Sequence, residues 1–284
     1  MRTASAKKSL DNVLHEYREN GFCILKNAIQ KEVLINVLEE INSVFALILK
    51  KNNLKTIPFK DDQTLYQNMQ TLFNFNVQLY LAAARHIAKL VSLQNLVSSP
   101  AVLEITKLFG IKIPTIPSSP VVHISSDKLK IPGGYYGVAP HQDWPSIQGG
   151  LDSIVMWMPF MDIDVNRFPL EVIPGSHKKG LWEGKIEEHT YTIKPELLNE
   201  NDFKRYTVNL GDVLIMSVFT VHQTGLKNSS GLRIASSTRY ENSEDTTFIE
   251  RGYPCAYQRK VHREFFTPDF PTKEQVNKAI NDKN

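Results

Sequence analysis

Residues 213–222 read VLIMSVFTVH, and this apolar run decides how the second half of the chain folds. A short continuous run of β-branched and aromatic residues is typical of a strand buried on both faces. The run ends at His222. We therefore expect a buried strand that stops there and places the imidazole of His222 at its mouth.

Short runs of the same kind fill the chain from residue 111 onward, separated by Gly, Pro, Asn and Asp. Such spacing is typical of strands joined by turns. We predict strands at 121–125, 135–139, 153–159, 170–173, 206–209, 213–218 and 232–240. Several short strands at this spacing favour a sandwich or a barrel closed on itself.

The first 110 residues have a helical pattern instead. Between Gln30 and Lys51 apolar residues recur at intervals of three and four, which predicts an amphipathic helix. The apolar run 21–25 suits a strand that leads into this helix. The stretches 63–93 and 101–108 predict further helices, the second with a glycine stop. We expect these helices to pack against one sheet.

Length and composition favour a folded protein. The chain has 284 residues, of which 42% are hydrophobic, and this excludes a disordered or fibrous chain. We expect a single domain over 1–284, with a mostly helical part at 1–110, a β core at 111–245 and a C-terminal extension at 246–284. The predicted fold class is α+β with a mainly β core.

The charge pattern excludes some partners. The net charge is +3, from 33 basic and 30 acidic side chains, and no basic stripe interleaved with aromatic residues is present, so we expect no nucleic-acid partner. No apolar window is long enough for a membrane span, and the basic start is not followed by an apolar signal core. We expect a cytoplasmic enzyme with a small-molecule substrate and no membrane partner.

The triplet His141-Gln142-Asp143 carries the strongest chemical signal. On an extended strand the first and third side chains leave the same face and can converge on one ion. Two imidazoles and one carboxylate suit iron(II) enzymes, because three positions stay open for a co-substrate and O₂. His222 is the best candidate for the second imidazole. The His-x-Asp spacing alone also occurs by chance.

Arg233 follows His222 by eleven positions and opens the predicted strand 234–237. A guanidinium aimed into an apolar barrel needs an anionic partner, since it cannot lose its charge. A dicarboxylate ligand would supply a bidentate partner. Taken alone, without the histidines, Arg233 is better explained by a salt bridge to an Asp or Glu of the chain.

From Gly21 to Tyr240 the sequence resembles the phytanoyl-CoA dioxygenase family of iron(II)/2-oxoglutarate-dependent enzymes. The matching segments are HQDW at 141–144, DSIVMW at 152–157, LEVIPGSHK at 170–178, GDV at 211–213, His222 and Arg233. The combination is specific, above all the Pro-Gly-Ser-His segment. The resemblance implies a double-stranded β-helix, also called a jelly-roll or cupin-like barrel.

The same resemblance implies a reaction and its principal residues. His141, Asp143 and His222 would bind Fe(II), and Arg233 would hold the distal carboxylate of 2-oxoglutarate. The implied activity is hydroxylation of a small organic substrate with O₂, giving succinate and CO₂. Related halogenases carry a small residue in place of Asp143, so the carboxylate favours hydroxylation. The family acts on acyl thioesters, amino acids, sugars and secondary metabolites, so the substrate stays open.

Further residues follow from the resemblance. Thr224 would add a hydroxyl to the distal carboxylate, and Trp157 and His123 would lie beside the co-substrate. Core packing is the alternative for Trp157, and a hydrogen-bonded core histidine is the alternative for His123. His177, in the turn that follows Pro174, is expected to be structural.

Two other functions remain open. A cupin-like isomerase or epimerase would need the metal but not Arg233, and a non-catalytic small-molecule-binding barrel could keep the metal as a structural feature. One departure from the family pattern precedes the Leu-Glu-Val segment, where family members often have Asn-Gly and this chain has Asn-Arg-Phe-Pro at 166–169. We expect Arg167 and Phe168 to contact the substrate. We expect the segment 128–137, with its two tyrosines, to lead to the site.

Overall fold

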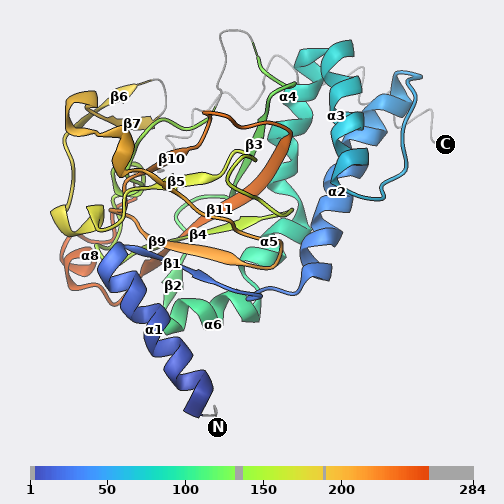
Figure 1. The fold of residues 1–284 in the computed structure, drawn as a ribbon. Coiled ribbons are helices and arrows are strands. Elements are labelled where there is room, and N and C mark those ends of the chain that lie inside the picture. The colour runs from blue at the N-terminus through green and yellow to red at the C-terminus, as the bar shows by residue number, and fades with distance from the viewer. Residues whose placement is uncertain (1–3, 132–136, 188–189, 256–284) are drawn as a thin grey trace.

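The computed structural model describes residues 4–131, 137–187 and 190–255. A helical N-terminal part is followed by two antiparallel sheets that curl around a shared interior (Figure 1). The last helix of the N-terminal part ends at Leu108, and the β core starts at Pro114. This order is the one that the sequence predicts.

The N-terminal helices are α1 Ala4–Asn20, α2 Lys31–Lys51, α3 Asp62–Phe75, α4 Val77–His86, α5 Val91–Val97 and α6 Pro100–Leu108, with a 3₁₀ turn at Ile87–Lys89. The predictions at 30–51 and 101–108 are confirmed as α2 and α6. The stretch predicted at 63–93 is divided, because the Asn76 side chain accepts hydrogen bonds from the N–H groups of Gln78 and Leu79 and begins a new helix. No helix was predicted over α1.

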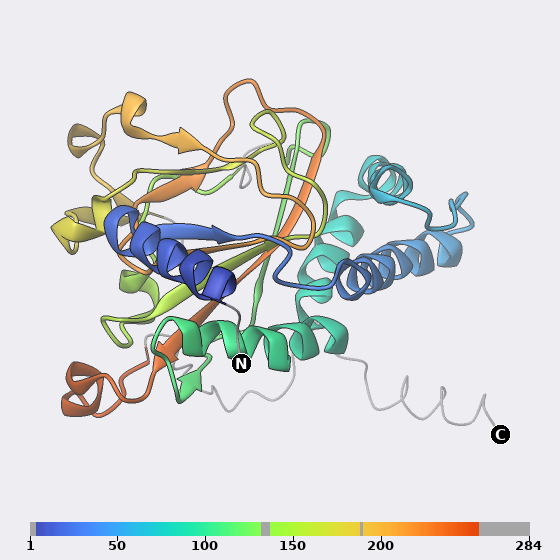
Figure 2. The same ribbon diagram turned by 60° about the horizontal axis from the view of Figure 1, so that its bottom comes forward.

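The larger sheet has the strand order β1-β9-β4-β11-β2, and β3 also pairs with β11. Its strands are β1 Phe22–Leu25, β9 Val213–Ser217, β4 Ile154–Pro159, β11 Leu232–Asn242, β2 Pro114–Thr115 and β3 Val121–Ser126. The strands predicted at 121–125, 153–159, 213–218 and 232–240 are confirmed to within two residues. Helices cover one face of this sheet (Figure 2).

The smaller sheet has the order β10-β5-β8, with β10 at His222–Thr224, β5 at Leu170–Val172 and β8 at Lys204–Arg205. The segment 138–141 runs beside β10, because the Thr224 N–H donates to the Val138 carbonyl at 3.0 Å. A hairpin of β6 Gly184–Glu187 and β7 Thr190–Ile193 joins through a bridge to the same segment. The two sheets form the double-stranded β-helix expected from the sequence.

One of the predicted strands is wrong, and a second is described only in part. At 206–209 only Val208 pairs, in a single bridge to Ile163, because the Asp212 carboxylate accepts a hydrogen bond from the Asn209 N–H and turns the chain. At 135–139, residues 137–139 are not in a strand, and residues 135 and 136 lie outside the described residues.

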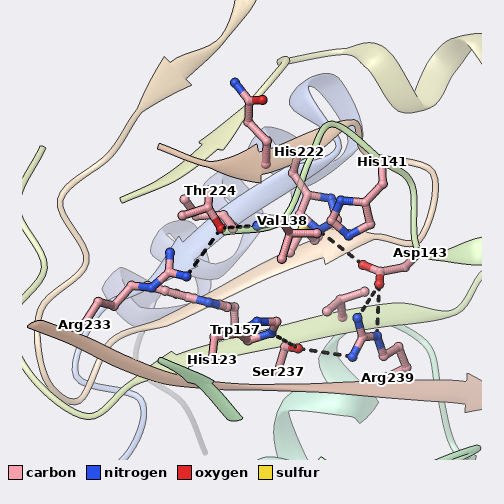
Figure 3. Close-up of a pocket in the computed structure, with 14 residues that line it drawn as sticks. His123, Val138, His141, Asp143, Trp157, His222, Thr224, Arg233, Ser237 and Arg239 are labelled. Carbon is pink, nitrogen blue, oxygen red and sulfur yellow. Dashed lines mark hydrogen bonds and ion pairs between the residues drawn. The ribbon is translucent and has the colours of Figure 1, made fainter. Parts of the chain in front are cut away.

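Strand β11 links the helical layer to the interior. On its outer face the Tyr240 hydroxyl donates to the Val97 carbonyl of α5 at 2.7 Å. Side chains alternate along a strand, so residues at odd positions point the other way. Arg233, Ser237 and Arg239 accordingly face the interior between the sheets (Figure 3). This strand therefore supplies one wall of the site.

The remaining short elements are α7 Trp144–Ile147, α8 Thr246–Glu250, and 3₁₀ turns at Ser176–Lys179, Pro195–Leu197 and Glu200–Asp202. Within the described ranges, no helix combines the length and the apolar character needed to cross a membrane.

Candidate metal centre

Two histidines lie side by side where β10 meets the segment 138–141. His141 and His222 face each other in an antiparallel bridge, and their ring centroids are 4.1 Å apart. Nδ1 of His141 lies 2.8 Å from the Ala139 carbonyl, and Nδ1 of His222 lies 2.9 Å from the Thr220 carbonyl. A carbonyl can only accept, so each Nδ1 carries the proton and each Nε2 keeps a lone pair for a metal.

The structure corrects the predicted placement of these ligands. Strand β9 ends at Ser217, whose hydroxyl and carbonyl oxygens accept hydrogen bonds from the following N–H groups and turn the chain. His222 therefore begins β10 in the opposite sheet and does not end the apolar strand. Asp143 is not extended either, with φ −78° and ψ −29° at the start of α7. The helical turn at Asp143 still brings its carboxylate beside both imidazoles.

The carboxylate of Asp143 has two different oxygens. Oδ1 accepts hydrogen bonds from Nε of Arg239 at 3.0 Å and from its Nη2, whereas Oδ2 is buried, accepts no hydrogen bond and lies 3.4 Å from Nε2 of His222. The ligand atoms of His141, Asp143 and His222, called the triad below, all lie within 4.8 Å of one another. A buried carboxylate oxygen without a donor, beside two imidazoles, fits a divalent cation.

The electrostatics keep the triad in the protonation states that bind metal. Burial favours a raised pKa at Asp143, but Arg239 and the two imidazoles outweigh it and hold the pKa of this carboxyl well below its ordinary value. Burial, reinforced by His222, lowers the pKa of His141 to about 3, and burial also lowers the pKa of His222. At neutral pH the triad is one carboxylate and two neutral imidazoles, so a metal would displace no proton.

Arg239 is the part of this site that the sequence analysis missed. Its guanidinium is nearly buried and donates to Asp143 and, at 3.2 Å, to the Ser237 hydroxyl. Arg239 follows Arg233 by six positions on the same strand, and an even separation places both side chains on one face. That alternation, counted onward from Arg233, is the signal that could have identified it.

Arg233 lies across the interior from the triad (Figure 3). Its guanidinium is buried and donates to the Phe168 carbonyl at 2.6 Å, the Ser125 hydroxyl at 2.9 Å and the Thr224 hydroxyl at 3.4 Å. The Cζ atom lies 5.9 Å from the centre of the Trp157 ring. The structure thus brings Thr224 and Trp157 next to Arg233.

His123 joins the same wall through a chain of hydrogen bonds. Its Nε2 lies 2.8 Å from the Ser237 hydroxyl, which also accepts from Arg239 (Figure 3). Burial, followed by the charge of Arg233, lowers the pKa of His123 well below its ordinary value. His123 is therefore a neutral, hydrogen-bonded histidine that lines the interior.

Two cavities meet at the triad. The inner cavity extends toward Arg233, Trp157 and Thr224 and is narrow, about 20 Å³. The outer cavity extends toward α4 and measures about 430 Å³. The residues that line both are His123, Val138, His141, Asp143 and Arg239. The triad therefore stands between two compartments.

Gln142, the middle residue of the triplet, points away from the triad and holds the segment 141–143 in place through hydrogen bonds. It is fully buried, and its Nε2 donates to the carbonyls of Gly180 at 2.8 Å and Phe219 at 2.6 Å. Its Oε1 accepts from the Trp182 N–H at 2.8 Å. No role for Gln142 was predicted, because its partners lie in two distant segments, at 180–182 and at 219.

Replacing Gln142 with alanine should destabilise the metal-free protein by about 3 kcal/mol, since three buried hydrogen bonds at about 1 kcal/mol each are lost. Urea unfolding measures this. Gln94→Ala is a matched control, because Gln94 makes one side-chain bond at 3.2 Å, to the Ala88 carbonyl, and should cost about 1 kcal/mol or less. Equal losses in the two variants would show that Gln142 does not fasten the segment.

The buried histidines also predict a pH dependence for the metal-free protein. His123 stays neutral when folded, but in the unfolded chain it takes up a proton below about pH 6.5. Such a group stabilises the folded protein above that pH. Its contribution to the free energy of unfolding falls by about 2 kcal/mol between pH 7 and pH 5. His123→Asn should therefore lose about 2 kcal/mol less than the wild type over this interval in urea unfolding. Parallel losses would contradict it.

Three other expectations have different outcomes. His177 is structural, as predicted, since its Nε2 lies 3.1 Å from the Arg18 carbonyl beside α1. The expected substrate contacts of Arg167 and Phe168 stay a prediction: Arg167 pairs with Asp62 of α3, Phe168 is buried, and neither residue lines the two cavities. The two tyrosines expected near the site, at 135 and 136, lie outside the described residues.

Fold and site together define a double-stranded β-helix protein with a candidate metal centre of two histidines and one aspartate. Residues 17–235 match the phytanoyl-CoA dioxygenase (PhyH) family, a range that includes the triad and Arg233. The protein therefore belongs to the phytanoyl-CoA dioxygenase family. No curated protein sequence matches it.

Solved structures share the fold. The epimerase SnoN, in complex with Fe³⁺, α-ketoglutarate and nogalamycin RO, is 17% identical with a TM-score of 0.54, over 84% of this chain and 85% of SnoN. The apo non-heme monooxygenase ThoJ is 15% identical with a TM-score of 0.56, over 95% and 93%. Apo EctD from S. alaskensis is 14% identical with a TM-score of 0.52, over 86% and 81%. These likenesses establish the architecture.

Proposed function

We propose that this protein is an iron(II)- and 2-oxoglutarate-dependent dioxygenase that hydroxylates a small organic substrate. The observation that carries the proposal is the position of the triad between an inner cavity that ends at Arg233 and an outer cavity beside α4. A co-substrate and a substrate must meet at one metal ion, and the two cavities reach the triad from different sides. Membership of the phytanoyl-CoA dioxygenase family supports the same chemistry.

In this proposal Nε2 of His141, Nε2 of His222 and Oδ2 of Asp143 hold the iron. Two nitrogens and one carboxylate oxygen leave positions for a co-substrate and O₂. The bound iron supplies the oxidising chemistry: O₂ and 2-oxoglutarate yield succinate and CO₂, and one oxygen atom enters a C–H bond of the substrate. Arg239 engages Oδ1 and so leaves Oδ2 facing the imidazoles.

Arg233 would bind the distal carboxylate of 2-oxoglutarate, because a planar guanidinium matches a carboxylate in a bidentate contact. Thr224 would add its hydroxyl, and Trp157 and His123 would form walls of the co-substrate site. The inner cavity has room for about one water molecule, less than a five-carbon diacid needs. Binding therefore requires lining side chains such as the flexible Met216 to move apart.

Two observations bear on the type of reaction. Asp143 fills the position that related halogenases leave open for a halide, which favours hydroxylation. An isomerase without 2-oxoglutarate, or a binding protein, would need no guanidinium at the end of the inner cavity, and Arg233 lies there. The likeness to SnoN, described as an epimerase with Fe³⁺ and α-ketoglutarate, makes oxidative epimerisation the second outcome to test.

The direct test uses full-length protein reconstituted with Fe(II) and supplied with 2-oxoglutarate and O₂. We expect succinate and CO₂ in equal amounts, slowly without a substrate, and only background when zinc replaces iron. Iron that binds stoichiometrically without any succinate formation would contradict the proposal. Metal-dependent conversion of a compound without consumption of 2-oxoglutarate would favour the isomerase instead.

A further inference from the structure

The outer cavity reaches the triad from the side of α4. His141 and Asp143 form part of its wall, so a molecule inside it lies next to the proposed iron. Its volume of about 430 Å³ falls within the range of roughly 300–1,000 Å³ that is usual for small-molecule sites. The residues that line this cavity therefore indicate which kind of molecule it binds.

The lining is mostly apolar. Its apolar residues are Leu81 and Ala84 of α4, Val121, Val122 and Ile124 of β3, and Leu129, Ile131 and Val138. Apart from the triad, the residues with polar groups are Tyr80, His123, Ser146 and Arg239. A molecule that fills the cavity would contact mostly hydrocarbon and few hydrogen-bonding groups.

The charges in this lining are already paired. Among the described residues that line the outer cavity, the two that carry charge at neutral pH are Asp143 and Arg239, and they form an ion pair with each other. Lys128 and Lys130 are close in sequence to the wall, but both are exposed and neither lines the cavity. A buried carboxylate or phosphate that finds no unpaired cation pays a large desolvation cost.

We propose that the outer cavity binds an uncharged, largely hydrocarbon molecule with one hydrogen-bonding group near His123 or Ser146. The further statement that this molecule is the substrate that becomes oxidised rests on the proposed function. Free amino acids, sugars and phosphorylated compounds have too many polar or charged groups for the described lining. Terpenoid or aryl-alkyl alcohols, ketones and amides have the required chemistry.

The test compares probes that share a carbon skeleton and differ in charge. Citronellol is paired with citronellate, and 4-phenylbutanol with 4-phenylbutyrate, with glucose as a polyhydroxyl control. Binding to the full chain without iron is measured by calorimetry, so that the result does not depend on turnover. We expect at least one alcohol to bind at least tenfold more tightly than its carboxylate, and glucose not to bind.

A pair of variants on α4 locates the binding. Ala84 is half-buried and lines the outer cavity, whereas Ala82 on the same helix is exposed. Ala84→Phe should weaken alcohol binding at least tenfold, and Ala82→Phe should leave it unchanged. The comparison of alcohols with carboxylates on the wild type remains decisive if Ala84→Phe fails to fold.

Three results would overturn the inference: a carboxylate or glucose that binds as tightly as the alcohols, no binding by either alcohol, or alcohol binding that a folded Ala84→Phe variant retains. The inference and the proposed function fail separately. Alcohol binding sensitive to Ala84→Phe, in a protein that forms no succinate, rejects the oxygenase alone. Succinate formation without any preference for the alcohols rejects the substrate class alone.

Discussion

Replacing Asp143 with alanine is expected to abolish iron binding at the triad and, with it, succinate formation from 2-oxoglutarate. Asp143 supplies the only anionic ligand of the triad. Without it, two neutral imidazoles face the unneutralised charge of Arg239, which repels a divalent cation. The measurements are iron content after reconstitution and the rate of succinate release, and both should fall to the level of protein without iron. His141→Ala should have the same effect.

Two controls make this result specific. Asp202→Ala removes an exposed carboxylate outside both cavities and should keep full iron content. Asp143→Asn is the second control, because it keeps the shape of the side chain. Circular dichroism verifies that each variant is folded. Iron-dependent succinate formation at the wild-type rate in folded Asp143→Ala would remove this residue from the metal centre.

The second large effect is expected for Arg233→Ala, which should raise the concentration of 2-oxoglutarate needed for half-maximal succinate formation by roughly ten- to a hundred-fold. A charge-assisted hydrogen bond contributes about 1.5–3 kcal/mol, which corresponds to that change in affinity. Iron content should be unchanged, because Arg233 lies across the inner cavity from the triad. Titration of 2-oxoglutarate at saturating iron measures the effect.

Arg233→Lys should recover part of the affinity, because lysine restores the charge but not the planar fork. Arg205→Ala is the matched control, since Arg205 pairs with Glu171 and does not line the inner cavity. A 2-oxoglutarate requirement that is equal in the wild type and folded Arg233→Ala would assign Arg233 to structure alone, as in the salt-bridge alternative.

Sequence patterns predicted the helices and strands that depend on residues close together in the sequence. The spacing of apolar residues in α2 and the long apolar strands β4 and β9 are properties of contiguous sequence. Helix α1 was not predicted, because its sequence is mostly polar and its contact with the core comes from partly buried residues such as Val13 and Tyr17. Likewise, β10 is short, and its strand conformation depends on its pairing with β5.

The candidate site shows the same division. The motif and the family resemblance indicated His141, Asp143 and His222, and the structure brings their ligand atoms together. The predicted strand conformation around these residues was wrong. The turn after β9 comes from local hydrogen bonds to Ser217, and the N–H of Asp143 donates to the carbonyl of Val218 in a distant segment. Arg239 was missed because its significance comes from its ion pair with Asp143, ninety-six positions away. The single-domain division of 1–284 stays a prediction.

The most direct test of the account is a crystal structure of the full chain grown with Fe(II) and 2-oxoglutarate in the absence of O₂. The account predicts one iron bound by His141, Asp143 and His222, with the far carboxylate of the diacid on the guanidinium of Arg233. An iron bound by other side chains, or a diacid seated away from Arg233, would contradict it.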